Sequence, residues 1–264
     1  MIRLGSTPDI HARPLHAALA EGELRSGISV ISQDTVSNCR DLIAGRLDVA
    51  LVSALDYARN SSELKLVRDF AVYSGQGSRN ALLFFRENLG PLTAVAAPLL
   101  DTPYQLLARI VLNEFYEQEV EWEAVEAVDS LEDALRQYPA VFLEGDPAMA
   151  LSRVRDNFLD IVSEWSDKTE LPFVHLLLAV PRESETTAFL APLATAREVG
   201  MRRLMEIARA AAGPDSPDWD FYFDLITDTY RYYPDVDMWH GLRQYYEFLF
   251  YYGLVDFLPD VHFL

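Results

Sequence analysis

The sequence contains a single cysteine, Cys39, among its 264 residues. One cysteine excludes a disulfide within the chain and any metal site built from several cysteines. No apolar run approaches the roughly 20 residues that cross a membrane. The segment Met1–Leu15 lacks both the basic part and the apolar part of a secretion signal. These absences predict a cytoplasmic protein that has no membrane partner.

Positive charge is also scarce. The chain has 22 Lys and Arg residues against 41 Asp and Glu residues, which gives a formal net charge of −19. A surface of that charge repels nucleic-acid phosphates and anionic lipid headgroups, so neither is expected as a partner. A small anionic ligand would need local arginines or backbone N–H groups in its binding site.

Common catalytic and metal-binding motifs are missing as well. The sequence has no Walker loop, no GxGxxG, no His-Glu-x-x-His and no Gly-x-Ser-x-Gly. Its five histidines do not follow the spacing of metal ligands. We therefore predict no metal site.

Strands and helices alternate along the first part of the chain. Strands are expected at 2–5, 28–32 and 48–53, and helices follow them, which indicates a mostly parallel α/β architecture. Ser53 is expected to cap the short helix after the third strand. The alternation restarts after Leu92 and includes a helix that begins near Ser130.

The stretch Leu159–Val180 combines a helix with a continuous apolar run, Val174–Val180. Such a run is typical of a strand buried on both faces, as in parallel sheets. His175 lies inside the run, so we interpret it as a buried imidazole in the core or facing a ligand. A single long helix is expected over Leu193–Ala212.

The tail, Trp219–Leu264, is expected to be helical and is strongly aromatic. An aromatic box for a ligand is one interpretation. Helices that pack on a sheet or on a second subunit are the favoured one, because aromatic residues dominate cores and interfaces. A homodimer through this tail is therefore kept among the expected partners.

The two αβ blocks predict two lobes. Residues 1–85 and 174–264 would form lobe one and residues 86–173 lobe two, with a ligand cleft between them. Loops at strand ends and helix starts would line it at 7–13, 76–80, 102–104 and 145–146. The predicted substrate-binding residues in or beside these loops are Arg13, Ser53, Arg79, Asn80, Thr102, Tyr104, Gly145 and Asp146. Arg13 and Arg79 are the cationic candidates for gripping a carboxylate.

Three separated motifs resemble one family, the chorismate dehydratases of the futalosine route to menaquinone. They are Asp48–Tyr57, Gly145–Ala148, and Glu164-Trp165 with Leu171-Pro172-Phe173. The resemblance implies a two-lobed fold of the type II periplasmic-binding-protein kind, here with an aromatic helical C-terminal tail. It also implies an enzyme without metal or organic cofactor.

Ligand-facing positions depart from the family pattern. His11 stands where the family has an asparagine, and Asn80 stands where it has a serine. The run Asp101-Thr102-Pro103-Tyr104 replaces a Ser-x-Thr-Ser run. Unlike asparagine, His11 can exchange a proton near neutral pH, so we predict it as the catalytic residue.

The resemblance implies a lyase that removes water from chorismate to give 3-[(1-carboxyvinyl)oxy]benzoate. Two alternatives stay open at this stage. One is a non-catalytic binder or sensor of a small carboxylate, because a fold alone does not fix a reaction. The other is the related 1,4-dihydroxy-6-naphthoate synthase.

Overall fold

The computed structural model describes residues 1–24, 27–86, 90–126, 130–213 and 216–264. These residues form two compact units. The first unit consists of Met1–Ser74, Val174–Trp239 and Leu258–Leu264, and the second of Gly75–Phe173 and His240–Phe257. Each unit has its own sheet. None of the helices in the described part of the chain is long and apolar enough to cross a membrane.

The units differ from the predicted lobes in two segments. Residues 75–85 belong to the second unit because strand β5 (Ala81–Phe85) pairs there with two neighbouring strands. Residues 240–257 also belong to it, because the aromatic face of helix α11 (Val236–Tyr251) packs within that unit. Strand pairing and ring packing across long sequence separations decide both assignments.

The first unit is built on a six-stranded sheet of order β11-β4-β10-β3-β1-β2. Its strands are β1 (Ile2–Ser6), β2 (Ile28–Ser32), β3 (Val49–Ser53), β4 (Leu64–Ser74), β10 (Phe173–Pro181) and β11 (Tyr230–Arg231). Strand β1 pairs in parallel with β2 and β3, as the early alternation predicts. The two-sheet α/β architecture expected from the sequence is confirmed.

Strand β10 corrects the expectation of a mostly parallel sheet. Its residues Phe173–Val180 are buried, as the apolar run predicts. It nevertheless runs antiparallel to β3, with Leu176 opposite Ser53. Burial on both faces determines which residues a strand uses but not its direction, and the chain here returns to the first sheet from the second unit.

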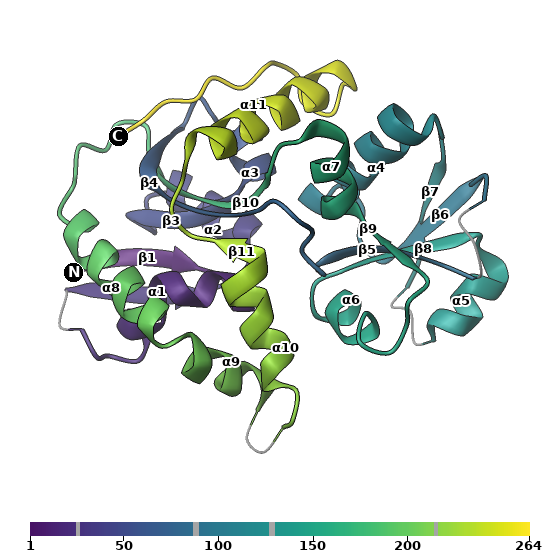
Figure 1. Ribbon diagram of the computed structural model, residues 1–264. Helices are drawn as coiled ribbons and strands as arrows, with labels where there is room; N and C mark the ends of the chain where they lie inside the picture. Colours follow the sequence, from purple (N-terminus) through teal and green to yellow (C-terminus); the bar gives the residue numbers. More distant parts are fainter. Residues whose placement is uncertain (25–26, 87–89, 127–129, 214–215) are drawn as a thin grey trace. The chain divides into compact units, whose positions relative to one another are not determined.

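Helices pack around the first sheet (Figure 1). They are η1 (Ile10–Ala12), α1 (Arg13–Ala20), α2 (Thr35–Ile43), α3 (Ala54–Arg59), α8 (Leu190–Arg202), α9 (Leu204–Ala212), α10 (Trp219–Asp224) and the π-helix η2 (Leu225–Thr229). The prediction of a single helix over 193–212 is wrong, because two helices lie in this range. The break is at Arg203, whose backbone leaves the helical region at φ −114° and ψ 20°.

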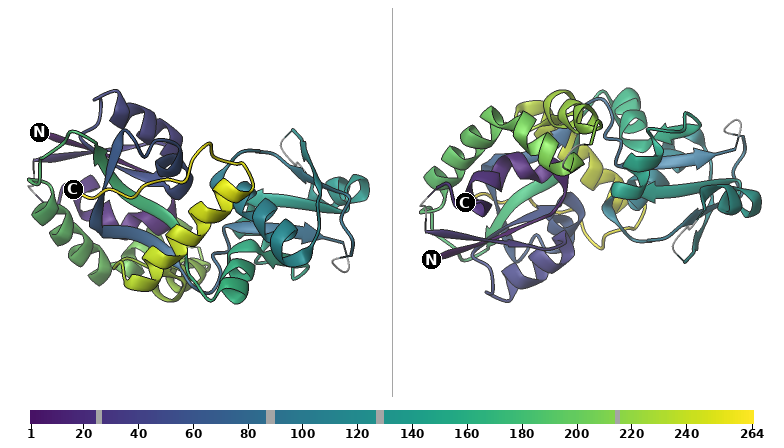
Figure 2. Two further views of the ribbon diagram at one scale, coloured as in Figure 1. Left: turned by 90° about the horizontal axis from the view of Figure 1, so that it is seen from above. Right: turned by 90° about the horizontal axis from the view of Figure 1, so that it is seen from below.

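Helices α1 and α8 lie side by side (Figure 1 and Figure 2). Their contact depends on Gly200, where an added Cβ would meet the carbonyl oxygen of Pro14 at 2.0 Å. Only a residue without a side chain lets these two backbones approach so closely.

We predict that Gly200→Ala lowers the free energy of unfolding by about 2–3 kcal/mol, because α1 and α8 must separate. Urea unfolding followed by circular dichroism measures the change. The matched control is Gly90→Ala, whose Cβ would meet no heavy atom within 4 Å. Equal stability of the two variants would contradict the packing described.

The second unit has a five-stranded sheet of order β7-β6-β8-β5-β9. Its strands are β5, β6 (Ala94–Ala97), β7 (Glu121–Ala124), β8 (Ala140–Glu144) and β9 (Phe158–Asp160). Its helices are α4 (Pro103–Tyr116), α5 (Leu131–Gln137), α6 (Asp146–Leu151), α7 (Ile161–Thr169) and most of α11. The sheet is mixed: β6 is parallel to β7 and β8, whereas β5 is antiparallel to β8 and β9.

Side-chain caps begin several helices as expected. Ser53 and Asp56 form a full capping box at α3, and Ser130 accepts a hydrogen bond from the backbone N–H of Asp133 at α5. In α11, Tyr245 packs edge-on against Trp165 and Phe173. Tyr230, Tyr232, Tyr245 and Tyr246 are buried, so part of the aromatic tail is core, as the favoured interpretation expects.

Candidate functional site

Three buried rings meet at the end of the first sheet. His11, on η1, lies with its ring centroid 5.8 Å from that of His175 and 5.1 Å from that of Tyr230. The rings of His175 and Tyr230 are 5.2 Å apart. We call His11, His175 and Tyr230 the ring triad. The predicted catalytic residue is thus a buried side chain held among aromatic neighbours.

Burial controls the charge of the two histidines. It lowers the pKa of His11, which the nearby Asp9 carboxylate opposes. It lowers the pKa of His175 well below the ordinary value, and the neighbouring His11 lowers it further. Both imidazoles are therefore neutral at pH 7, and each has one ring nitrogen with a lone pair.

Arg13 lines a separate groove of about 530 Å³ in the first unit. Thr7 and His16 line the same groove, and Arg13 Nε donates a long hydrogen bond of 3.4 Å to the carbonyl oxygen of Pro8. Thr7 Oγ1 and both ring nitrogens of His16 are buried, without a well-aligned hydrogen-bond partner among the described residues. Burial, with a smaller contribution from the charge of Arg13, lowers the pKa of His16 to about 4.

We predict that acid destabilises the protein through its buried histidines. Their pKa is lower when folded than when unfolded, so the unfolded chain binds more protons and stability falls as the pH drops below about 6.5. For His16 the loss continues to about pH 4 and amounts to about 3 kcal/mol.

Urea unfolding between about pH 7.5 and 5 measures this slope, above the range where carboxylates titrate. His16→Leu should flatten it, whereas the exposed His240→Gln should leave it unchanged. A free energy of unfolding that is constant over this range would contradict the burial of these neutral imidazoles.

Ser53 has its hydroxyl engaged in the capping box of α3. Its Oγ donates to the Asp56 carboxylate at 2.6 Å and accepts from the Asp56 backbone N–H at 3.0 Å. The sheet register places it opposite Leu176, so its side chain lies on the Leu176 face of the sheet, whereas the side chain of the adjacent His175 points to the other face. The Ser53 side chain therefore stabilises a helix start.

In the second unit, Asn80 connects two of the predicted segments. Its Nδ2 donates to the Tyr104 hydroxyl at 2.8 Å, and its carbonyl accepts from the Gly145 N–H at 3.0 Å. Gly145 has φ 71° and ψ −150°, a conformation that glycine adopts readily. The structure thus brings together Asn80, Tyr104 and Gly145, which come from three distant stretches of the sequence.

Thr102 caps α4 and extends this network. Its Oγ1 accepts from the Gln105 N–H and donates to the Glu144 carboxylate at 2.6 Å. Glu144 ends β8, directly before Gly145, so it belongs to the same group although sequence reasoning missed it. Asp146, the first residue of α6, is exposed to solvent, and its side chain caps no helix.

Asp160 fixes the loop that carries Arg79. Its Oδ2 accepts from the backbone N–H groups of Ser78 and Arg79 at 2.9 and 2.8 Å, and its Oδ1 accepts from Val162 and Ser163. Burial raises the pKa of Asp160, and these hydrogen bonds oppose the rise. The backbone of Arg79 is in the left-handed region, with φ 56°. Its Cζ lies over the ring of Phe158, 5.3 Å from the ring centroid.

We predict that Asp160→Asn releases this loop, because an amide NH₂ would face backbone donors. Unfolding free energy should fall by about 1–3 kcal/mol. Hydrogen exchange should quicken at the Ser78 and Arg79 amides. The exposed Asp156→Asn is the control, and unchanged exchange in Asp160→Asn would refute the anchoring role.

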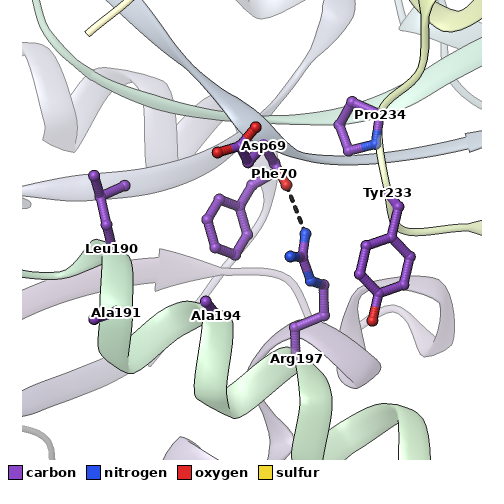
Figure 3. Close-up of a pocket in the computed structure, with 8 residues that line it drawn as sticks. All are labelled: Asp69, Phe70, Leu190, Ala191, Ala194, Arg197, Tyr233 and Pro234. Atoms are coloured by element: carbon purple, nitrogen blue, oxygen red, sulfur yellow. Dashed lines mark hydrogen bonds between the residues drawn. The ribbon is translucent and has the colours of Figure 1, made fainter.

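A second cavity in the first unit has a volume of about 400 Å³ and is lined by Arg197 among other residues. Figure 3 shows its guanidinium between Phe70 and Tyr233, with Cζ 4.7 and 4.2 Å from their ring centroids. Its Nη1 donates to the carbonyl oxygens of Asp69 and Tyr232 at 2.6 and 3.2 Å. Stacking and hydrogen bonds together join α8 to β4, so we assign Arg197 a structural role.

Sequence reasoning missed some residues around the ring triad, as it missed Glu144 near Asn80. It noted His175 as a buried imidazole but did not connect it with Ser74, whose Oγ lies 2.8 Å from His175 Nε2. It also missed Tyr230, one of many tail aromatics. Within the described residues, no group of three or more His, Cys, Asp or Glu side chains could hold a metal ion.

The profile of a family described as menaquinone biosynthesis matches residues 2–251 of the chain. No curated protein sequence matches this chain. The family match covers the ring triad. It also covers the hydrogen-bonded residues of the second unit, which are Asn80, Thr102, Tyr104, Glu144 and Gly145.

Solved structures share the fold at low sequence identity. A protein from Archaeoglobus fulgidus is 18% identical with a TM-score of 0.72, covering 96% of this chain and 98% of that one. An ABC transporter protein from Parabacteroides distasonis is 13% identical with a TM-score of 0.70, covering 100% and 98%. The periplasmic aliphatic sulphonate binding protein from Escherichia coli is 13% identical with a TM-score of 0.67, covering 98% and 90%. These likenesses confirm the periplasmic-binding-protein type of fold.

Proposed function

The chain belongs to the menaquinone biosynthesis family, and from this premise we propose that it is a lyase that removes water from chorismate. The product would be 3-[(1-carboxyvinyl)oxy]benzoate. The observation that carries the proposal is His11, a neutral and buried imidazole at a position where the resembled family has an asparagine. A neutral imidazole can take up a proton and release it again near pH 7.

The reaction balances without a redox partner. A C–H bond of the ring breaks, and its electron pair forms the new C=C bond that completes an aromatic ring. The C–O bond breaks, and the hydroxyl leaves with its electron pair and one proton as water. His11 accepts the carbon-bound proton and returns it to the leaving hydroxyl, so the imidazole ends each cycle neutral.

A substrate carboxylate is an alternative base for the same reaction. His11 would then take that proton from the substrate carboxyl group and pass it to the leaving hydroxyl, so the imidazole again ends the cycle neutral. In both versions His11 touches the reacting atoms, so replacement of its ring tests both.

Arg13 and Arg79 are the proposed partners of the substrate carboxylates. Neither forms a salt bridge with an acidic side chain in the described part of the chain. Arginine can bind a carboxylate with two parallel hydrogen bonds, which matters in a protein of net charge −19. Asn80, Tyr104 and the backbone around Gly145 supply further polar contacts in the second unit.

A non-catalytic binder of a small anion is the second candidate. It is supported by the structural likeness to the aliphatic sulphonate binding protein, whose name describes it as a binder. The related 1,4-dihydroxy-6-naphthoate synthase reaction is a third candidate, since the family description names the route and not the step.

We predict that purified protein incubated with chorismate forms a product lighter by one water, detected by mass spectrometry. His11→Ala should cut turnover by roughly two to four orders of magnitude, the typical effect of losing an acid–base group. His11→Asn, which restores the family residue, should keep more activity than His11→Ala.

The exposed His240→Gln is the control and should turn over chorismate like the unchanged protein. Loss of water no faster than in a protein-free sample would rule out the lyase. Binding of chorismate without product, measured by calorimetry, would then favour the binder.

A further inference from the structure

The groove that contains Arg13 is distinct from the ring triad. None of His11, His175 and Tyr230 is among the described residues that line it. The groove lies where α1 packs against β2, the strand at one edge of the first sheet. Its volume of about 530 Å³ falls within the range of roughly 300–1,000 Å³ that is typical of small-molecule sites. It can therefore hold a small organic ligand.

The two ends of the groove differ in character. Strand β2 begins at Ile28, ends at Ser32 and is parallel to β1. Helix α1 connects these two strands, so it runs back from the carboxyl end of β1 toward the amino end of β2. The lining residues at the carboxyl ends of the strands are Thr7, Pro8, Arg13 and Ser32, and those toward the other end are Met1, Leu19, Ala20 and Ile28. One end is thus polar and the other mostly apolar.

Two buried polar side chains line the groove. Thr7 is 1% exposed and His16 is 7% exposed. Thr7 Oγ1 and both ring nitrogens of His16 have no well-aligned hydrogen-bond partner among the described residues. The carbonyl oxygens of Thr7 and of His16 itself lie near the ring, but neither completes a hydrogen bond with it. Buried polar atoms are nearly always hydrogen-bonded, so these atoms are suited to bond a ligand.

Arg13 gives the groove its positive charge. Its Nε donates only a long hydrogen bond of 3.4 Å to the carbonyl oxygen of Pro8, and it forms no salt bridge in the described part of the chain. No Asp or Glu is among the described residues that line the groove, although the chain has 41 of them. The groove is therefore a locally positive place on an acidic protein, which favours an anion.

These groups favour one class of anion. A single arginine matches a single negative charge, and its guanidinium can bind a carboxylate with two parallel hydrogen bonds. A threonine hydroxyl and a neutral imidazole can each donate a further hydrogen bond. A phosphate dianion would bring two charges to one arginine. The apolar end suits a hydrocarbon body, which gains free energy by leaving water.

We propose that this groove is a binding site for a small monocarboxylate with an apolar body. Arg13 pairs with the carboxylate, and Thr7 and His16 complete its hydrogen bonds. The body lies toward Leu19 and Ile28. This site goes beyond the proposed function and does not depend on it. The two share Arg13, so a carboxylate in the groove would compete with the substrate for this arginine.

Benzoate is the probe, because it joins one carboxylate to an apolar ring and has no hydroxyl to lose. In a titration followed by NMR with labelled protein, benzoate should shift the signals of the His16 imidazole and the Thr7 amide. The signals of the His175 ring should stay in place. No shift at the groove, or shifts confined to the ring triad, would overturn the assignment.

Substitutions then test the role of each group. Arg13→Gln should weaken the affinity for benzoate by about ten- to a hundredfold, as expected for a lost charged hydrogen bond. Thr7→Val should weaken it by about two- to tenfold, whereas Thr7→Ser, which keeps the hydroxyl, should bind like the unchanged protein. The exposed Arg202→Gln is the matched control for the loss of one positive charge. Equal affinities of Arg13→Gln and Arg202→Gln, with both folded by circular dichroism, would overturn the site.

Two comparisons separate this site from its alternatives. Inorganic phosphate should bind more weakly than benzoate in the same titration, and tighter binding of phosphate would overturn the carboxylate assignment. Product formation from chorismate tests the lyase alone. Benzoate bound in the groove of a protein that forms no product would support this site and rule out the lyase. Product formation without benzoate binding would do the reverse.

Discussion

The return of the chain to the first sheet as β10 is the constraint on which the first unit depends. This strand is buried along Phe173–Val180 and lies between β3 and β4 at the centre of the sheet. Removing so much apolar surface from water is a large stabilising contribution. It also carries His175 into a dry setting beside Ser74, so core formation and the environment of the ring triad arise from one strand.

Much of this architecture could be predicted from local patterns. Alternating apolar segments indicated the strands, and capping residues such as Ser53 and Ser130 indicated where helices begin. Strand direction could not be predicted, because an apolar run reads the same in either sense. The break at Arg203 was also hidden, since residues on both sides favour a helix and tertiary packing decides between one helix and two.

The candidate site residues also divide into those that the sequence predicts and those that only the structure shows. Asn80, Tyr104 and Gly145 were predicted in one site because they lie at strand ends and helix starts, and hydrogen bonds connect Asn80 to both of the others. Ser74 and Tyr230 could not be found in this way. Serine and tyrosine are common, and these two meet only through the pairing of β11 with β4, which brings together residues far apart in the chain. Ser53 and Thr102, in turn, hold helix starts whatever else they contact.

The π-helix before Tyr230 decides how this segment can tolerate a change of length. A π turn contains one residue more than an α turn over the same full rotation. Deletion of a single residue within Leu225–Thr229 that restores α geometry would therefore leave the direction of the following residues nearly unchanged. Tyr230 would stay with the histidines in a chain that is one residue shorter. The extra residue of the π turn is thus one that this segment can lose without dispersing the ring triad.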